Sequence, residues 1–250
     1  MLLKSSFALF VVLLFLSGCA ADGQFNTEKA VQIGAGALQA TMLDEQSVMQ
    51  AAALTAKELD AKYQVAAANS PYATRLHTLT ANMHNYDGLR LNYKVYISKD
   101  VNAFAMADGT IRVHSALMDL MPDDQVLAVI SHEIGHVKLK HSYHQMKEDM
   151  LTNVAFQAVS SMGGAIGALS ASQLGALAQG VVSARFSQSD ELEADTYAVR
   201  ALKQLGKDPY AMKRSIETLQ QQSASNAGFL SSHPSNQKRI ENIQTEIRRL

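Results

Sequence analysis

The stretch SHEIGHVKLKH, residues Ser131–His141, decides how this 250-residue chain folds and what it can do. It contains the pattern H-E-x-x-H, formed by His132, Glu133 and His136. On a helix the two histidines are four residues apart, so their rings lie on one face and can bind one metal ion. Glu133 lies about 100° further round the helix, close enough to reach a water on that metal. The motif alone is only moderately specific, so a further ligand must come from elsewhere.

A later helical segment supplies a matching acidic pattern. Glu191 and Asp195 are also four residues apart, whereas Glu193 between them points elsewhere. A catalytic zinc ion takes three protein ligands and keeps one position open for water. We therefore expect Glu191 to complete a His-His-Glu site and Asp195 to accept a hydrogen bond from a ligand histidine. For an acidic helical turn on its own, a solvated surface is the alternative interpretation.

Composition restricts the class of protein. The chain is 47% hydrophobic and 18% charged, which is typical of a globular protein. With 22 Lys+Arg against 23 Asp+Glu its net charge is -1, so it lacks the basic surplus of a nucleic-acid-binding protein. The C-terminal run RIENIQTEIRRL, residues 239–250, is locally basic, but its interleaved acids favour a solvated helix face.

The N-terminus has the layout of a secretory signal. Lys4 precedes the apolar run Phe7–Leu16, which is too short for a comfortable membrane span. Cys19, the single cysteine of the chain, ends the sequence L-S-G-C, which resembles the bacterial lipobox. That resemblance implies a signal peptide over residues 1–18 and a lipidated tether over residues 19–38. The alternative is an ordinary signal with an incidental cysteine.

Lipidation of Cys19 would have two consequences. Two or three acyl chains would anchor the protein stably in a membrane, and they would remove a lone thiol from an oxidising compartment. In the familiar sorting pattern, Asp directly after the cysteine retains a lipoprotein in the inner membrane. Ala20 stands there in this chain, which points to the outer membrane of a Gram-negative bacterium, facing the periplasm.

Within the mature chain, residues 39–250 are predicted to form one α+β domain that is mainly helical. Helical periodicity covers Gln39–Gln64, and a second helix is expected from Pro71 to about His84. The segment that follows alternates with period two, which predicts a half-buried strand. Its predicted buried residues are Leu91, Tyr93, Val95 and Ile97.

Two further short strands are expected at Asn102–Ala105 and Thr110–His114, and a short helix at Ser115–Leu120. The H-E-x-x-H helix should begin at Asp123 and Asp124, because acidic residues favour a helix N-terminus. The sequence therefore predicts a small sheet beside this helix.

Residues 151–182 are rich in Ala, Gly and Ser, but Ser and Gln interrupt every apolar run before the roughly 18 residues that a membrane span needs. Gly163 and Gly167 form a G-x-x-x-G pattern, for which close packing in a soluble core is favoured over membrane dimerisation. Three more helices are expected to follow, over residues 186–206, from Pro209, and from about Ser235 to the end.

Together the motifs resemble those of the M48 zinc peptidases, the gluzincins that include the HtpX-like and CAAX-processing proteases. Members carry H-E-x-x-H, then E-x-x-A-D with its first Glu on zinc, then H-P-x-x-x-x-R. The second motif corresponds to Glu191–Asp195, and the third begins at His233 and ends at Arg239. The resemblance implies a gluzincin-type fold and one Zn²⁺ per chain, bound by His132, His136 and Glu191.

The resemblance also suggests roles for residues around the zinc. His233 is a candidate for an extra ligand in a closed state or for stabilising the transition state, with a purely structural loop as the alternative. Arg239 is a candidate for supporting the ligands, whereas His141 is expected to be structural or to lie behind them. Many members have Ser-Arg before E-x-x-A-D, but this chain has Ser187-Gln188, so a contact that depends on that arginine is not expected.

The implied activity is a metalloendopeptidase in which zinc polarises the scissile carbonyl and Glu133 is the general base. An edge strand would bind extended substrate by strand addition, through Ile111, Arg112, Val113 and His114. Expected partners are unfolded or misassembled envelope proteins, the membrane through a lipid on Cys19, and other envelope proteases or outer-membrane assembly machinery; nucleic acid is not among them. The alternative is a largely latent, zinc-containing lipoprotein that acts as an assembly factor or chaperone, with the His233 loop closing the site.

Overall fold

The computed structural model describes residues 44–152, 169–222, 228–234 and 237–250, which all belong to one compact unit, Met42–Leu250. The predicted signal peptide and tether, including Cys19, lie outside the described residues, and so does the Gly163/Gly167 pair. Within the described ranges, no helix combines the length and the hydrophobicity that crossing a membrane requires.

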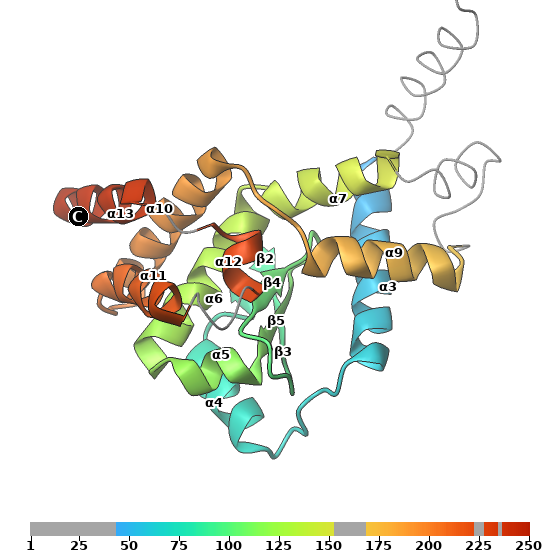
Figure 1. The fold of residues 1–250 in the computed structure, drawn as a ribbon, viewed down its shortest axis with the longest axis horizontal. Coiled ribbons are helices and arrows are strands. Elements are labelled where there is room, and N and C mark those ends of the chain that lie inside the picture. Colours follow the sequence, from blue (N-terminus) through green and yellow to red (C-terminus); the bar gives the residue numbers. More distant parts are fainter. Residues whose placement is uncertain (1–43, 153–168, 223–227, 235–236) are drawn as a thin grey trace, which may run out of the picture. The chain divides into compact units, whose positions relative to one another are not determined.

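A small three-stranded sheet lies at the centre of the described fold (Figure 1). Its strands, in spatial order, are β3 (Asn92–Tyr96), β5 (Thr110–His114) and β4 (Ala103–Ala105). β3 is parallel to β5, and β4 is antiparallel to it. Two shorter strands, β1 (Asn85–Tyr86) and β2 (Leu89–Arg90), form a separate antiparallel pair.

Helices pack on both faces of the sheet (Figure 1). The H-E-x-x-H motif lies on α6 (Asp123–Lys138), which packs against β4, α10 (Gln188–Gln204) and α11 (Tyr210–Gln222). On the other side, α3 (Glu45–Lys62) contacts α7 (His141–Thr152) and α9 (Ala171–Val182). The remaining described helices are α4 (Pro71–Thr80), α5 (Ser115–Leu120), α12 (Gly228–Ser232) and α13 (Gln237–Arg249). The predicted α+β class, mainly helical with a small sheet beside the motif helix, is confirmed.

Two apolar clusters fill the space on the two sides of the sheet. Ile111 and Val113 of β5 belong to the cluster that includes α6, α10 and α11. Tyr96 and Phe104 belong to the other, which includes α3, α7 and α9. Successive side chains of a strand point to opposite faces, so the sheet is covered on both sides and holds α6 in place from one of them.

This double coverage corrects the prediction of a half-buried strand. Tyr96, predicted on the solvent side, is fully buried, whereas Ile97, predicted to be buried, is 36% exposed. The reason is α3, whose presence over the second face cannot be inferred from local periodicity. The Tyr96 ring stacks on Tyr63 with 4.8 Å between centroids, and its hydroxyl donates to Asp60.

The structure also defines two helix boundaries that the sequence placed only approximately. Helix α3 begins at Glu45, because Asp44 is extended and its carboxylate accepts a hydrogen bond from the Ser47 amide at 2.8 Å; Gln39, the predicted start, lies outside the described residues. The second helix ends at Thr80 and not near His84, since the chain must turn there to enter the β1–β2 pair.

The predicted edge strand is the central strand of the sheet. β5 pairs with β3 on one side and with β4 on the other, so its residues Ile111, Arg112, Val113 and His114 have no open edge for a substrate. All four are also buried. Their prediction as a substrate-binding edge is therefore wrong. The strand that lies next to α6 and pairs on one side alone within this sheet is β4.

Arg112 instead connects the sheet to α3. Its Nε and Nη2 atoms donate to the Asp60 carboxylate at 2.9 and 3.1 Å, and its Nη1 atom donates to the Asn92 side chain at 3.0 Å. The Arg112 side chain is 2% exposed. Burial by itself would raise the pKa of Asp60, but hydrogen bonds from Arg112, Lys94 and Tyr96 outweigh burial and lower it.

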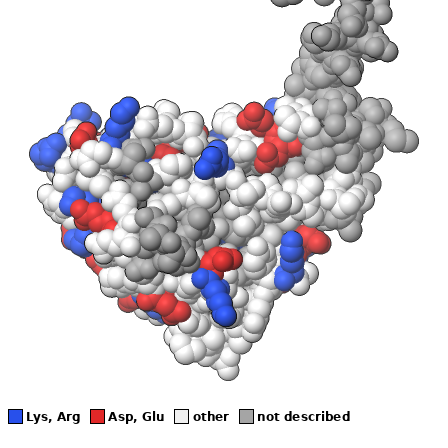
Figure 2. Space-filling model, in the orientation of Figure 1, with Lys and Arg blue, Asp and Glu red and all other residues white. Residues whose placement is uncertain are grey.

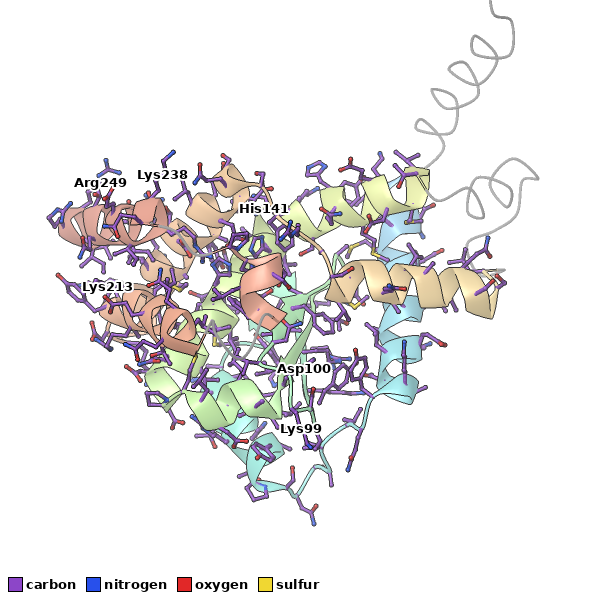
Figure 3. All side chains as sticks on the ribbon, viewed as in Figure 1. Lys99, Asp100, His141, Lys213, Lys238 and Arg249 are labelled. Carbon is purple, nitrogen blue, oxygen red and sulfur yellow. The ribbon has the colours of Figure 1, made fainter. Side chains whose placement is uncertain are left out.

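The C-terminal helix α13 is only partly the solvated face that its charge pattern predicted. Lys238 and Arg249 lie at the outside of the fold in Figure 3, and on the face shown in Figure 2 charged side chains of both signs are interspersed. Arg239 and Glu246, however, are 1% and 4% exposed. Arg200 of α10 pairs with Glu246 at 2.6 Å, and Arg239 points towards the motif helix.

Replacing Asp60 with Ala should destabilise the protein by about 3 kcal/mol, because the Arg112 guanidinium would remain buried without its counter-charge. Urea unfolding followed by circular dichroism measures the change. As a control, Glu217→Gln breaks the Lys213–Glu217 pair within α11, which should cost about 0.5 kcal/mol or less. Equal losses in the two variants would contradict the structural role of Asp60.

Candidate metal centre

The candidate site lies where α6 and α10 approach each other closely. A Cβ atom added to Gly135, between the two motif histidines, would come within 3.1 Å of the Ala194 Cα atom and 3.2 Å of its carbonyl oxygen. The missing side chain therefore allows the two backbones to come together. As a result, the histidines of α6 lie directly opposite the acidic motif of α10.

A capping box fixes the start of α10 one turn before that motif. The Ser187 side chain accepts a hydrogen bond from the Asp190 amide, and the Asp190 carboxylate accepts one from the Ser187 amide. Gln188, where many M48 members have arginine, is the first helical residue. The helix that starts here buries Glu191 and Asp195, which are 2% and 0% exposed.

Four side chains that could bind a metal ion converge between the helices. His132, His136, Glu191 and His233 each offer one ligand atom, and these atoms all lie within 4.8 Å of one another. The Nε2 atoms of His132 and His136 are 3.0 Å apart, and Glu191 Oε1 lies 3.4 Å from the latter. The structure thus brings the three predicted ligands together and adds His233.

His233 enters the cluster directly after α12. Its Nδ1 atom lies 2.9 Å from Glu191 Oε1 and 3.3 Å from His132 Nε2. The residue is 1% exposed, and its backbone amide donates to the Phe229 carbonyl. A residue from a distant segment is therefore held at the centre, which favours a functional role over that of a surface loop.

Two aromatic rings at the site were missed by the sequence interpretation. Phe186 stacks on His136 with 3.8 Å between ring centroids, and Phe229 stacks on His233 at 4.4 Å. Both had a local signal that could have found them. Phe186 directly precedes the N-cap of α10, and Phe229 lies four residues before His233 on a helical turn.

Asp195 and Arg239 hold the ring of His132. Asp195 Oδ1 lies 3.0 Å from His132 Nδ1, so the Nε2 atom of that ring points into the cluster. Arg239 donates to both Asp195 oxygens at 2.7 and 2.6 Å, and its Nη1 atom lies 2.6 Å from Glu191 Oε2. Burial alone would raise the pKa of Asp195, but the Arg239 guanidinium outweighs it and lowers the pKa. This arrangement keeps Asp195 ionised and fixes the ring orientation.

His136 has a corresponding partner behind it. The Nδ1 atom of His141 lies 3.1 Å from His136 Nδ1, and its Nε2 atom lies 3.6 Å from carboxylate oxygens of Asp190 and Glu193. Lys140 has a left-handed backbone, with φ 64°, and it turns the chain so that His141 folds back onto α6. Figure 3 shows His141 close to the middle of the fold. His141 thus supports a ligand-type histidine and is not one of the four cluster residues.

Glu133 is fully buried beside the cluster. Its Oε1 atom lies 3.5 Å from His233 Nε2, and neither carboxylate oxygen has a hydrogen bond of good geometry within the described residues. Burial raises the pKa of Glu133 to about 7. A buried carboxylate so weakly satisfied by the protein is suited to contact a molecule or ion outside the chain.

The cluster carries a surplus of negative charge. It buries three carboxylates, those of Glu133, Glu191 and Asp195, against the single guanidinium of Arg239. Uncompensated charge is costly away from water, and the same surplus raises the pKa of His233 although burial opposes this. Two imidazoles and a carboxylate are also a donor set of catalytic zinc sites. Both the charge and the donor atoms therefore fit a divalent metal ion.

Comparisons with known proteins agree with this geometry. Residues 70–247 match the family described as Peptidase family M48. The chain is 40% identical to Metalloprotease LoiP of Escherichia coli strain K12 over 93% of its own length and 92% of that protein. It is 36% identical to Metalloprotease YcaL of the same strain over the same shares. A Beta-barrel assembly-enhancing protease of Escherichia coli O157:H7 is 33% identical over 56% of this chain and 31% of its own length.

Replacing Glu191 with Gln should weaken metal retention by more than the roughly 10- to 100-fold typical of residues behind the ligands, because a negatively charged donor is lost from the cluster. Metal content after dialysis against a graded chelator measures this without any activity assay. Glu193→Gln, two residues away and with a side chain 56% exposed, should retain the metal nearly as the wild type does. An equal loss in both variants would show that Glu191 is not a ligand.

Proposed function

The chain belongs to peptidase family M48 and is a metalloendopeptidase, and from this premise we propose that it binds one Zn²⁺ ion through His132, His136 and Glu191. One observation carries the proposal: the ligand-type atoms of these residues and His233 lie within 4.8 Å of one another, beside the buried carboxylate of Glu133. Imidazole donors suit Zn²⁺, whereas Mg²⁺ and Ca²⁺ prefer sites made of oxygen atoms alone.

Glu133 is the proposed general base and acid. Zinc, when bound, would lower the pKa of a water molecule towards about 7 and polarise the scissile carbonyl. Glu133 accepts the proton of the attacking water on a carboxylate oxygen and delivers it to the nitrogen of the leaving amine. Burial supports the first step, because it raises the pKa of Glu133 and so favours uptake of a proton by this carboxylate.

The surrounding residues hold this machinery in position. Asp195, fixed by Arg239, orients His132, and His141 orients His136. His233 has its Nε2 atom next to Glu133, from where it can donate a hydrogen bond to negative charge that develops in the transition state.

We propose that the substrate binds in extended form along β4, and not along β5 as the sequence suggested. The outer edge of an edge strand offers unpaired backbone groups, to which a peptide can add as a further strand. β4 packs against α6, which carries Glu133, so a peptide paired there would run past the base.

We further propose that the substrates are unfolded or misassembled proteins of the bacterial envelope. The N-terminal layout supports this, since a lipid on Cys19 would anchor the domain to the outer membrane and leave it facing the periplasm. One relative is named a beta-barrel assembly-enhancing protease, which is in keeping with this location. Other envelope proteases and the outer-membrane assembly machinery are the proposed partners.

A second candidate function is favoured by the position of His233. Its Nδ1 atom belongs to the ligand-type cluster, where it would occupy the position that a catalytic site keeps open. A protein held in that arrangement would be a largely latent lipoprotein that assists envelope assembly as a chaperone.

Changing Glu133 to Gln should leave the metal in place and reduce cleavage of unfolded casein by at least about 100-fold, because proton transfer by a positioned base typically contributes 10²–10⁴-fold. Metal analysis and gel-based cleavage of the same samples make the measurement. If the zinc-loaded wild type cleaves nothing and Glu133→Gln matches it in every cellular assay, the latent alternative is correct.

Replacing Cys19 with Ala should abolish incorporation of labelled palmitate and release the protein from the membrane fraction, because no thiol remains to carry the lipid. Ala20→Asp should keep the lipid but move the protein to the inner membrane. Sucrose-gradient separation of the two membranes distinguishes these results. Unchanged membrane association of the Cys19 variant would support the ordinary-signal alternative.

A further inference from the structure

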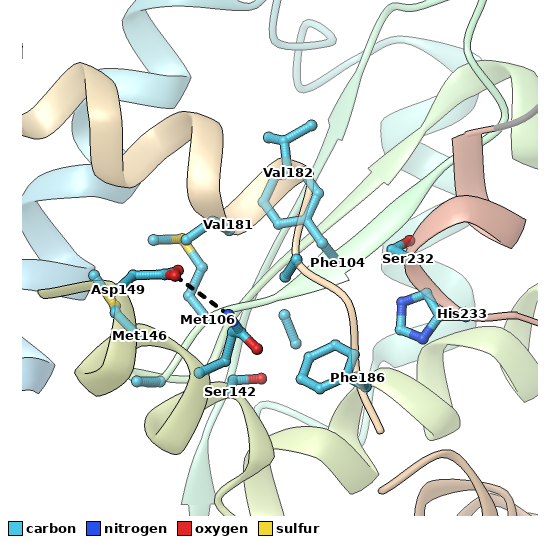
Figure 4. A pocket seen from close by; sticks show the side chains of 14 residues that line it. Phe104, Met106, Ser142, Met146, Asp149, Val181, Val182, Phe186, Ser232 and His233 are labelled. Carbon is cyan, nitrogen blue, oxygen red and sulfur yellow. Dashed lines mark hydrogen bonds between the residues drawn. The ribbon is translucent and has the colours of Figure 1, made fainter. Parts of the chain in front are cut away.

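A pocket lies directly beside the candidate metal centre (Figure 4). Four segments line it: residues 104–107 at the end of β4, one face of α7, residues from 181 to 186 at and beyond the end of α9, and residues 232–233 at the end of α12. Its cavity volume is about 20 Å³, so the adaptable side chains of its walls must move apart to admit a long side chain. His233 and Phe186 form one end of the pocket, and both contact His136, so the pocket is continuous with the site of the chemistry.

The walls of this pocket are mostly apolar. The apolar side chains are those of Phe104, Met106, Met146, Val181, Val182 and Phe186. Methionine side chains adapt their shape to an occupant. Such walls suit an extended chain of methylene groups as well as an aromatic ring, so the polar groups decide which occupant fits best.

The polar groups of the pocket come from one face of α7. Ser142, Gln145 and Asp149 are spaced at i, i+3 and i+7, which places them on the same side of the helix. Asp149 is the one carboxylate among the lining residues, and Figure 4 shows it at the far side of the pocket from His233. The Ser142 hydroxyl is buried and has no hydrogen-bond partner within the described residues.

The Asp149 carboxylate is partly buried without a counter-charge. Its carboxylate accepts a hydrogen bond of 3.3 Å from the Gln145 amide, and no Lys or Arg of the described residues pairs with it. On its other side the backbone of α9 comes so near that a Cβ atom on Gly180 would lie 3.0 Å from Asp149 Oδ2. Burial and the neighbouring Glu148 raise the pKa of Asp149. A cation placed in the pocket would relieve the cost of this charge.

We propose that this pocket is a subsite for a basic side chain of the peptide substrate, with Asp149 and Ser142 binding the cationic end of a lysine or arginine. The apolar walls would contact the methylene stem, as they do wherever these long side chains lie along apolar surface. The proposal rests on the proposed peptidase function, since it assigns the substrate class of the same site.

Because the pocket lies beside β4, the preference for a basic side chain should apply to one position of the substrate sequence. A peptide paired with β4 directs alternate side chains to the same face, and residues 104–107 of that strand and its continuation line the pocket. One substrate side chain at a fixed distance from the scissile bond would therefore enter it. Cleavage sites should share a Lys or Arg at one constant position and show no charge preference elsewhere.

The test compares two peptides that differ at that position alone, one with lysine and one with norleucine, which keeps the stem but lacks the charge. The zinc-loaded full chain should first be given unfolded casein, and the cleaved bonds mapped by mass spectrometry, to find the position. We then expect kcat/KM to favour the lysine peptide by at least about tenfold, because a desolvated charge pair is worth more than that when one partner is removed. Asp149→Asn should reduce this preference to within about twofold, since the charge is lost at nearly constant volume.

Glu148→Gln is the matched control, because it removes the same charge one residue away on α7, from an exposed side chain. It should keep the preference for lysine. Ser142→Ala should lower the preference in part, since one hydrogen bond to the cation is lost. Equal cleavage of the two peptides by the wild type, or equal loss of preference in Asp149→Asn and Glu148→Gln, overturns the proposal.

Binding provides a measurement that does not depend on turnover. Fluorescence anisotropy with the zinc-loaded Glu133→Gln chain should show tighter binding of the lysine peptide than of the norleucine peptide, and the added change Asp149→Asn should remove the difference. If binding depends on Asp149 but the wild type cleaves no peptide, the subsite is supported and the proposed catalysis is wrong. If cleavage proceeds without any preference for lysine, the catalysis is supported and the subsite is wrong.

Discussion

The constraint on which the rest of the structure depends is the burial of three carboxylates between α6 and α10. Charges so far from water persist when countercharges and hydrogen bonds reach them from several directions. In this chain Arg239 arrives from α13 and His233 from the end of α12, and both residues lie more than forty positions beyond Glu191 in sequence. The close approach at Gly135 keeps the two motif helices near enough for these contacts. The helices that pack around α6 therefore hold the residues of this charged cluster together.

The residues of the cluster that could be predicted from the sequence are those with local geometry. His132 and His136, and likewise Glu191 and Asp195, are related by one helical turn, so spacing alone places each pair on one face. His233 and Arg239 were identified by resemblance and not by spacing, because nothing local connects their segment to α6. Phe186 had weak signals, and its ring position depends on how residues 184–186 cross the site.

The fold shows the same division between local and non-local information. The three strands were each found from composition and alternation, yet their order was not, because pairing partners are chosen across the chain. β5 was interpreted as an edge although β3 and β4 pair with both of its sides. The burial of Tyr96 also escaped prediction, since it depends on α3, whose Asp60 receives hydrogen bonds from both Tyr96 and Arg112. The periodicity of a sequence predicts which side of a strand faces a single apolar core. This sheet, however, lies between two apolar clusters, one on each face.

The metal centre and the pocket beside it differ in how their negative charges are balanced. A divalent cation together with Arg239 would balance the three buried carboxylates, so the loaded centre would offer a cationic substrate side chain no net attraction. The carboxylate of Asp149 is not part of that balance, because its contacts are with Gln145 and with the backbone of α9. Within the part of the chain that the structure describes, Asp149 therefore has no counter-charge, even when the metal centre is neutralised. Any preference for a basic residue close to the scissile bond must then come from α7, one helix away from the groups that carry out the reaction.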